Sequence, residues 1–115
     1  MSIDDIERFC LQLPGAHKRV QWGGVHVFSV GERKMFATLH LSGAGALAFK
    51  VDDDHFLGFC DRPGFRPAPY LARARWVSLD RPGVVAAAEL KDLLTRSHQL
   101  VVARLPKRQR VGLLL

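Results

Sequence analysis

HKRVQWGGVHVFSVGERKMFATLHLSGAGALAFKV, residues 17–51, is the stretch that decides the fold. Its apolar and polar residues alternate with a period of two, which is typical of half-buried β-strands. Four strand-like runs can be separated in it, at 17–22, 25–30, 34–41 and 46–51. The connections between them are short and most contain glycine, so consecutive strands are expected to pair antiparallel. The stretch therefore predicts a four-stranded meander with one apolar face and one polar face.

A short helix is predicted before the meander. Apolar residues recur there at spacings of three and four, which places them on one helical face. These residues are Ile3, Ile6, Phe9, Cys10 and Leu13. Ser2 or Asp4 can cap the start of the helix, and Pro14 followed by Gly15 ends it.

After the meander, the sequence predicts a short helix, a loop, one more strand and a long helix. An acid of the run 52–54 can cap the short helix, and 61–74 is predicted to be a loop because it holds three of the six prolines. Residues 75–79 are predicted to form a fifth strand and 85–104 the longest helix. The expected buried stripe of that helix is Leu90, Leu93, Leu94, Ser97, Leu100 and Val101, and its expected outer face is Lys91, Asp92, Arg96 and Gln99.

This order of elements predicts a single α+β domain over residues 1–115. Strands in one block with a helix at each end favour an antiparallel sheet of about five strands, covered on one face by the N- and C-terminal helices. A chain of 115 residues is long enough to bury one core.

The net charge of +6 is unevenly distributed along the chain. Residues 1–60 hold six Lys and Arg against seven Asp and Glu, whereas residues 61–115 hold eleven against four. A basic excess of this kind raises the local concentration of an anionic partner, although it also serves solubility. The N-terminus lacks the basic flank of a signal peptide and no run reaches the length of a membrane span, so a cytosolic protein without membrane contact is expected.

The leading functional hypothesis is nucleic-acid binding, DNA included, through phosphate contacts. Arginines alternate with aromatic residues between 62 and 76, and cations follow the long helix after Pro106. The expected contact residues are Arg73, Arg75, Lys107, Arg108 and Arg110, with Lys18 and Arg19 in support. The helix dipole favours the same cations near a helix C-terminus, which is the structural alternative.

A second hypothesis is a protein-interaction or small-ligand module. In it, a concave sheet face and the loop RPGFRPAPY, residues 62–70, form a pocket for an acidic protein or a small anion. Trp22, Tyr70 and Trp76 are the pocket candidates, with Arg75 beside them; Trp76 is equally compatible with the core. The chain is expected to be a monomer or a weak homodimer.

Three stretches together resemble the MmcQ/YjbR family of small bacterial proteins. They contain Leu13-Pro14-Gly15 ahead of Trp22-Gly23, then Pro67, Tyr70 and Trp76-Val77, and a last helix that ends in Ser97 to Pro106. The resemblance spans nearly the whole chain. It implies a CyaY-like fold, in agreement with the α+β sandwich, and a role in DNA binding, and it brings no catalytic residues.

The sequence offers no clear catalytic or metal site. The five histidines show no close ligand spacing, and the acids Asp4, Asp5 and Glu7 are better explained by helix capping than by cation binding. Cys10 and Cys60 are expected to be reduced core thiols. LSGAGAL, residues 41–47, is interpreted as a hairpin turn, because a strand follows it where a phosphate loop would need a helix. A protein without catalysis, cofactor or metal is expected.

Overall fold

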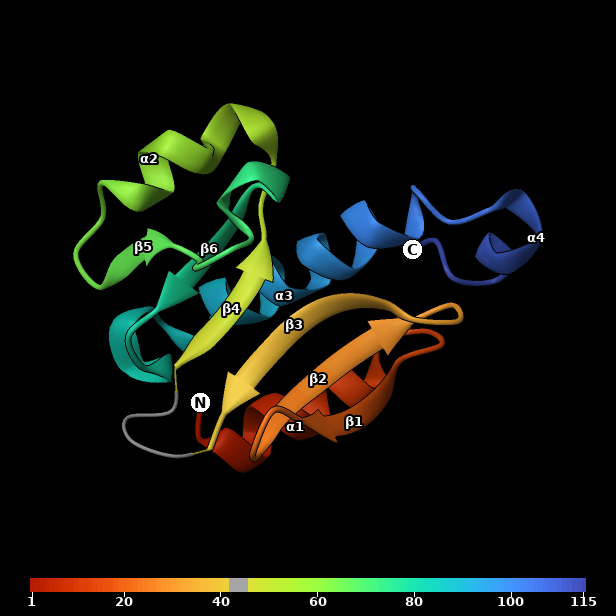
Figure 1. Ribbon diagram of the computed structural model, residues 1–115, viewed down its shortest axis with the longest axis horizontal. Coiled ribbons are helices and arrows are strands. Elements are labelled where there is room, and N and C mark those ends of the chain that lie inside the picture. The colour runs from red at the N-terminus through yellow and green to blue at the C-terminus, as the bar shows by residue number, and fades with distance from the viewer. Residues whose placement is uncertain (42–45) are drawn as a thin grey trace.

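The computed structural model describes residues 1–41 and 46–115. One antiparallel sheet of six strands, in the order β1-β2-β3-β4-β6-β5, forms its centre, and α1 and α3 lie together behind it in the view of Figure 1. The strands are β1 (His17–Gln21), β2 (Val25–Val30), β3 (Lys34–His40), β4 (Leu47–Lys50), β5 (Phe65–Pro67) and β6 (Trp76–Leu79). The helices are α1 (Ile3–Gln12), α2 (Phe56–Cys60), α3 (Ala87–Val102) and α4 (Lys107–Arg110), and the 3-10 turns are η1 (Asp53–His55), η2 (Ala72–Ala74) and η3 (Pro82–Val84).

The predicted α+β architecture is confirmed. The first four strands form the expected meander, and β6 is the expected fifth strand. The interpreted hairpin turn at 41–47 falls largely on residues 42–45, which lie outside the described residues.

The sheet has one strand more than predicted, because β5 lies inside the segment expected to be a loop. β5 pairs only with β6, through Phe65 opposite Leu79 and Pro67 opposite Val77. An edge strand needs hydrogen bonds on one side only, so a proline that lacks an N–H is tolerated there.

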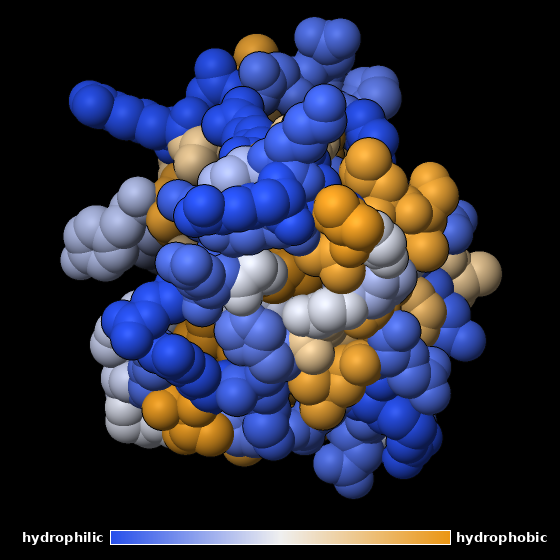
Figure 2. Space-filling view, turned by 90° about the vertical axis from the view of Figure 1, so that its right-hand side faces the viewer, coloured by the Kyte–Doolittle hydropathy of each residue, from blue (hydrophilic) through white to orange (hydrophobic). Residues whose placement is uncertain are grey.

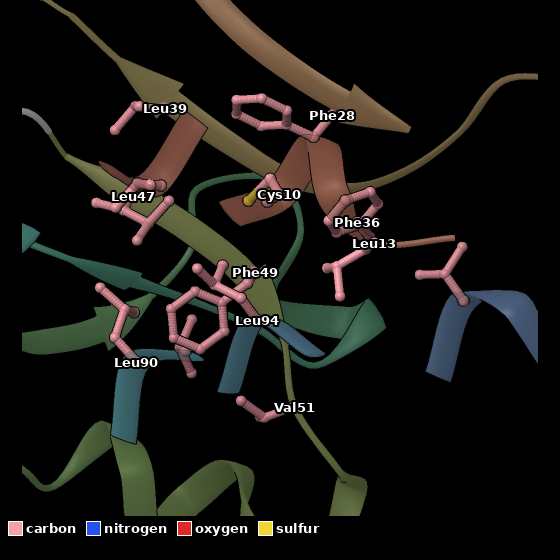
Figure 3. Packing of buried hydrophobic residues seen from close by; sticks show 14 of the residues in the cluster. Cys10, Leu13, Phe28, Phe36, Leu39, Leu47, Phe49, Val51, Leu90 and Leu94 are labelled. Carbon is pink, nitrogen blue, oxygen red and sulfur yellow. The ribbon is translucent and has the colours of Figure 1, made fainter. Parts of the chain in front are cut away.

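The core lies between the sheet and the two long helices. Phe28, Phe36 and Phe49 of the sheet pack against Cys10 of α1 and Leu94 of α3 in Figure 3. Burial of such an apolar face supplies most of the stabilisation of a helix on a sheet. The prediction that both helices cover one face is therefore confirmed.

Ser97 anchors α3 to an irregularity of the sheet. Phe36 is an extra residue in β3, because Ala37 pairs with Phe28 while Met35 pairs with Ser29. The buried Ser97 hydroxyl donates to the Phe36 carbonyl at 2.6 Å and accepts the Lys50 N–H at 2.9 Å. A β-bulge leaves backbone groups without ladder partners, and here one serine satisfies two of them.

Two capping predictions had different outcomes. At α1 the Ser2 hydroxyl accepts the Asp5 N–H at 3.1 Å, and the Asp5 carboxylate accepts the Ser2 N–H at 3.0 Å, which is a capping box. At η1 the predicted acidic cap is wrong, because the Asp52 side chain makes no capping bond. Asp52 instead accepts hydrogen bonds from Arg96 of α3, the shortest at 2.6 Å.

Gln99 differs from its predicted place on the outer face of α3. Its side chain is half-buried, donates to the Leu113 carbonyl at 3.0 Å and accepts the Leu115 N–H at 2.8 Å. Beside it, His98 is fully buried and its Nε2 lies 2.8 Å from the Pro14 carbonyl oxygen. These contacts fix the C-terminal segment and the end of α1 to the same helix.

Candidate functional site

The structure does not bring all the predicted contact cations together. Arg73 and Arg75 lie just before β6, whereas α4, with Lys107, Arg108 and Arg110, lies at the right-hand end of Figure 1, beyond the end of α3. The two groups were expected on one surface because the last helix was expected to lie close to the fifth strand, so that its tail would extend the same positive surface. α3 reaches the start of β6 at Ser97, which bonds to Lys50 opposite Trp76, but α4 lies further on, beyond the end of α3, and this separates the two groups.

Two of the predicted cations have acidic partners. The Arg75 Nε lies 3.7 Å from the Asp53 carboxylate, and its guanidinium stands over the Phe56 ring, 5.5 Å from the ring centroid. Lys18 donates to Glu7 of α1, and this bond lowers the pKa of the Glu7 carboxyl. Each cation therefore has a carboxylate beside it that would compete with a polyanion.

α4 lies beside the turn between β2 and β3. The position that a Cβ would occupy on Gly31 is 2.8 Å from the Gln109 side chain and 2.9 Å from that of Leu105, so the segments are in close contact. The Arg110 Nη1 donates to the Ala103 carbonyl at 3.4 Å, which is the stabilising role at a helix C-terminus that the sequence left open. Figure 2 shows this end of the molecule, where hydrophilic side chains surround a group of hydrophobic ones.

A pocket of about 590 Å³ lies on the sheet face opposite the helices, and we call it the open-face pocket. Two loops and three neighbouring strands form it. The β1–β2 turn and the first residue of β2 contribute Trp22, Gly23, Gly24 and Val25. The loop after β5 contributes Ala68, Pro69, Tyr70 and Leu71. The three strands β3, β4 and β6 and the residue before β4 contribute Met35, Thr38, His40, Ala46, Leu47, Ala48 and Ser78. The lining is mostly apolar, although this face of the sheet was expected to be polar.

Trp22 stands at the rim of the pocket in a turn that the sequence placed one residue too late. The predicted first strand ended at Trp22, but β1 ends at Gln21, and the Gly24 N–H donates to the Gln21 carbonyl at 3.2 Å to close the turn. Both central residues have positive φ, 47° at Trp22 and 71° at Gly23. Hairpin turns place glycine or asparagine at such positions. Trp22 occupies one of them and remains 66% exposed.

Tyr70 repeats this arrangement in a different turn. The Leu71 N–H donates to the Ala68 carbonyl at 3.1 Å, so Pro69 and Tyr70 are the central residues. Proline followed by a residue of positive φ is the pattern of a type II turn, in which glycine is usual at the second position. Tyr70 has a φ of 66° there, and its side chain is fully exposed.

Trp76, the third aromatic pocket candidate, lies beneath the pocket and does not line it. It is 4% exposed and packs with Ala48 and Ala68, against which Met35 and Leu71 are also packed. Arg75, expected beside the pocket, does not line it either. Of the four residues, the structure places Trp22 and Tyr70 together.

A smaller groove of about 250 Å³ adjoins the pocket at Trp22 and Met35, which line both. We call it the arginine groove, because Arg19 of β1 and Arg33 of the β2–β3 turn line it beside His17. The sequence analysis missed Arg33 and Met35. Strand alternation places Arg19 on the face opposite Lys18, but no local pattern indicates that the β2–β3 turn reaches the same groove.

The remaining reactive groups lie elsewhere in the fold. Burial raises the pKa of the Cys10 thiol to about 12 and also raises the pKa of Cys60. Among residues 1–41 and 46–115, no three His, Cys, Asp or Glu side chains are grouped as metal ligands would be. Within the same ranges, no helix has both the length and the apolar character needed to cross a membrane.

Comparisons with known proteins give the following matches. A family model described as YjbR matches residues 11–100. The Deinococcus radiodurans protein DR2400, which carries a DUF419 domain, is similar with a TM-score of 0.87 and 27% sequence identity, over 97% of this chain and 87% of that one. A Pseudomonas syringae protein shares the fold with a TM-score of 0.72 and 19% identity, over 88% of this chain and 99% of that one. No curated protein matches the chain.

Proposed function

This chain belongs to the YjbR family, and we propose that it binds a small, largely apolar ligand in the open-face pocket. The observation that carries the proposal is the pair of exposed aromatic residues, Trp22 and Tyr70, held at positive φ on the rim of one apolar cavity. Ligand pockets typically enclose about 300–1,000 Å³ and combine an apolar lining with few polar groups. The pocket, at about 590 Å³, is in this range.

The proposed role is binding without catalysis, in the cytoplasm. Besides Trp22 and Tyr70, the side chains with polar atoms in the described lining of the pocket are Thr38, His40 and Ser78. In the described part of the chain, none of them is hydrogen-bonded to a carboxylate that would activate it as a nucleophile or base. The free thiols of Cys10 and Cys60 support a reducing compartment.

A titration with the neutral fluorescent probe N-phenylnaphthylamine tests the proposal. Trp22→Gly and Tyr70→Gly remove the rings and leave a residue suited to the backbone, so both variants fold. Each aromatic contact contributes about 0.5–1.5 kcal/mol, so the double variant is expected to bind about tenfold more weakly. Leu57→Ala, which removes an exposed apolar side chain from α2, is the matched control. Absence of binding by the wild type, or equal binding by the double variant, would contradict the proposal.

A second candidate function is nucleic-acid binding at the end of the molecule that carries α4. One specific observation favours it. Lys107 and Arg108 lie between Leu105 and Gln109, whose side chains meet Gly31 of the β2–β3 turn. Arg33 of that turn and Lys34 at the start of β3 follow Gly31, and none of the four cations has an ion-pair partner within residues 1–41 and 46–115. We call these four residues the basic end. It replaces the predicted surface, because Arg73, Arg75 and Lys18 are not part of it.

Fluorescence anisotropy with a labelled DNA duplex and single strand, at two salt concentrations, tests this candidate. Contacts from the four cations of the basic end would give a log–log salt slope of about −3 to −4. The double variant Lys107→Gln, Arg108→Gln should flatten the slope by about two, while Arg73→Gln with Arg81→Gln, which also removes two charges, should not change it. No binding at low salt rejects nucleic acid as the partner.

A further inference from the structure

The arginine groove gives the open-face pocket a charged extension. We infer that the ligand of the pocket is a small amphiphilic anion whose apolar body fills the pocket and whose carboxylate or phosphate headgroup binds Arg19 and Arg33. This inference rests on the proposed ligand-binding function and adds the chemical class of the ligand.

Adjacency of the two cavities is the first step. Trp22 and Met35 line both, so a molecule long enough to cross these two side chains would reach from the pocket into the groove. Beyond them the lining changes from apolar to polar, with Gln21, Ser29 and His17 joining the arginines. An apolar compartment thus lies directly beside a polar one.

Charge is the second step. Neither Arg19 nor Arg33 forms an ion pair within residues 1–41 and 46–115. The described lining of both cavities contains no Asp or Glu. The adjacent Lys18, whose side chain lies on the other face of β1, is paired with Glu7. The face with the pocket therefore keeps its positive charge, while the face toward α1 is neutralised.

Geometry favours an anion over other ligands of the groove. Guanidinium groups bind carboxylates and phosphates through paired N–H donors, and two arginines on one small groove can act on a single headgroup. His17 is held by its Nε2, 3.0 Å from the Gly31 carbonyl oxygen, so this wall of the groove is fixed between β1 and the β2–β3 turn. A cationic or purely apolar ligand would leave both arginines without a partner.

The experiment compares three ligands that share one apolar chain: decanol, decanoate and decyl phosphate. Isothermal titration calorimetry on the full chain is expected to give at least tenfold tighter binding for one of the anions than for decanol, and the tighter anion identifies the headgroup. In Arg19→Gln, Arg33→Gln this preference should fall to less than threefold. Arg81→Gln, Lys91→Gln loses the same net charge away from the groove and should keep the preference.

The outcomes separate this inference from the function on which it rests. If decanol binds as tightly as both anions, the headgroup site is refuted while ligand binding in the pocket stands. If none of the three binds, both proposals fail. If sedimentation shows a dimer that dissociates in Trp22→Gly, Tyr70→Gly, a second copy of the chain covers the face, and the small-anion site is overturned.

Discussion

Removal of the Ser97 hydroxyl is the sharpest test of how the helix layer is fixed to the sheet. In Ser97→Ala, the Phe36 carbonyl and the Lys50 N–H both lose their partner, at a site that is fully buried. The two bonds join α3 to β3 and to β4, and the Ser97 hydroxyl makes both of them. We therefore expect a large loss of stability from the deletion of one oxygen atom.

The magnitude follows from the two orphaned groups. A buried backbone group without a partner costs about 1–3 kcal/mol, and relaxation recovers part of this, so Ser97→Ala should lose about 2–4 kcal/mol. A single domain has only about 5–15 kcal/mol in total. Thr95→Ala is the matched control, because Thr95 bonds to the Lys91 carbonyl at 2.8 Å on the exposed side of the same helix. The control should lose less than about 0.5 kcal/mol.

Urea unfolding measured by circular dichroism gives both values. With an m-value of about 1–2 kcal/mol/M, Ser97→Ala should lower the midpoint by at least about 1 M without changing m. A midpoint shift no larger than that of Thr95→Ala would falsify the assignment of Ser97 as the link between α3 and the bulge.

Three further predictions concern other buried or strained positions. Burial lowers the pKa of the His98 imidazole in the folded protein from its ordinary value of 6.5, so the unfolded chain binds a proton more readily. The melting temperature should therefore fall as the pH drops below about 6.5. His98→Gln should have a lower melting temperature at pH 7, but its melting temperature should fall less between about pH 7 and pH 5.5. With its pKa at about 12, the Cys10 thiol should resist iodoacetamide in the native protein and react after unfolding, as intact mass would show; rapid native alkylation contradicts this. An alanine in the left-handed region costs about 1–2 kcal/mol of stability. Gly112→Ala, at a φ of 78° in open space, should lose that amount, whereas Gly31→Ala, at a φ of 61° with its Cβ 2.9 Å from Leu105, should lose more. Equal urea midpoints for the two variants would refute the close contact.

Most of the sheet could be predicted because its signals are local. Alternation in residues 17–51 depends only on which side chains face the core, and the turn residues between the runs fix antiparallel pairing. β5 was missed because it has three residues, one of them Pro67, in a segment whose three prolines indicate a loop. The cap expected near Asp52 was wrong for a different reason: Arg96 of α3, far along the chain, takes the carboxylate.

The candidate site was less predictable, since it depends on where turns bring side chains from separate strands. Trp22 and Tyr70 were predicted to line a pocket between a concave sheet face and the loop 62–70, but Arg33 carries no signal that distinguishes it from other charged turn residues. The predicted cationic surface relied on the last helix lying close in space to the fifth strand, which begins near Arg75. Asp53 pairs with Arg75, and the direction of α3 carries the cations of α4 away from it. Neither feature is a local property of the sequence.

The backbone at the pocket rim connects stability with binding. A left-handed conformation costs a residue with a Cβ about 1–2 kcal/mol, and neither Trp22 nor Tyr70 recovers this by burial, because both rings are largely in solvent. Glycine would satisfy both turns at lower cost, so the fold alone does not require these side chains. In the proposed complex a bound molecule would cover both rings, and burial of their apolar area would then offset the left-handed strain that the free protein carries.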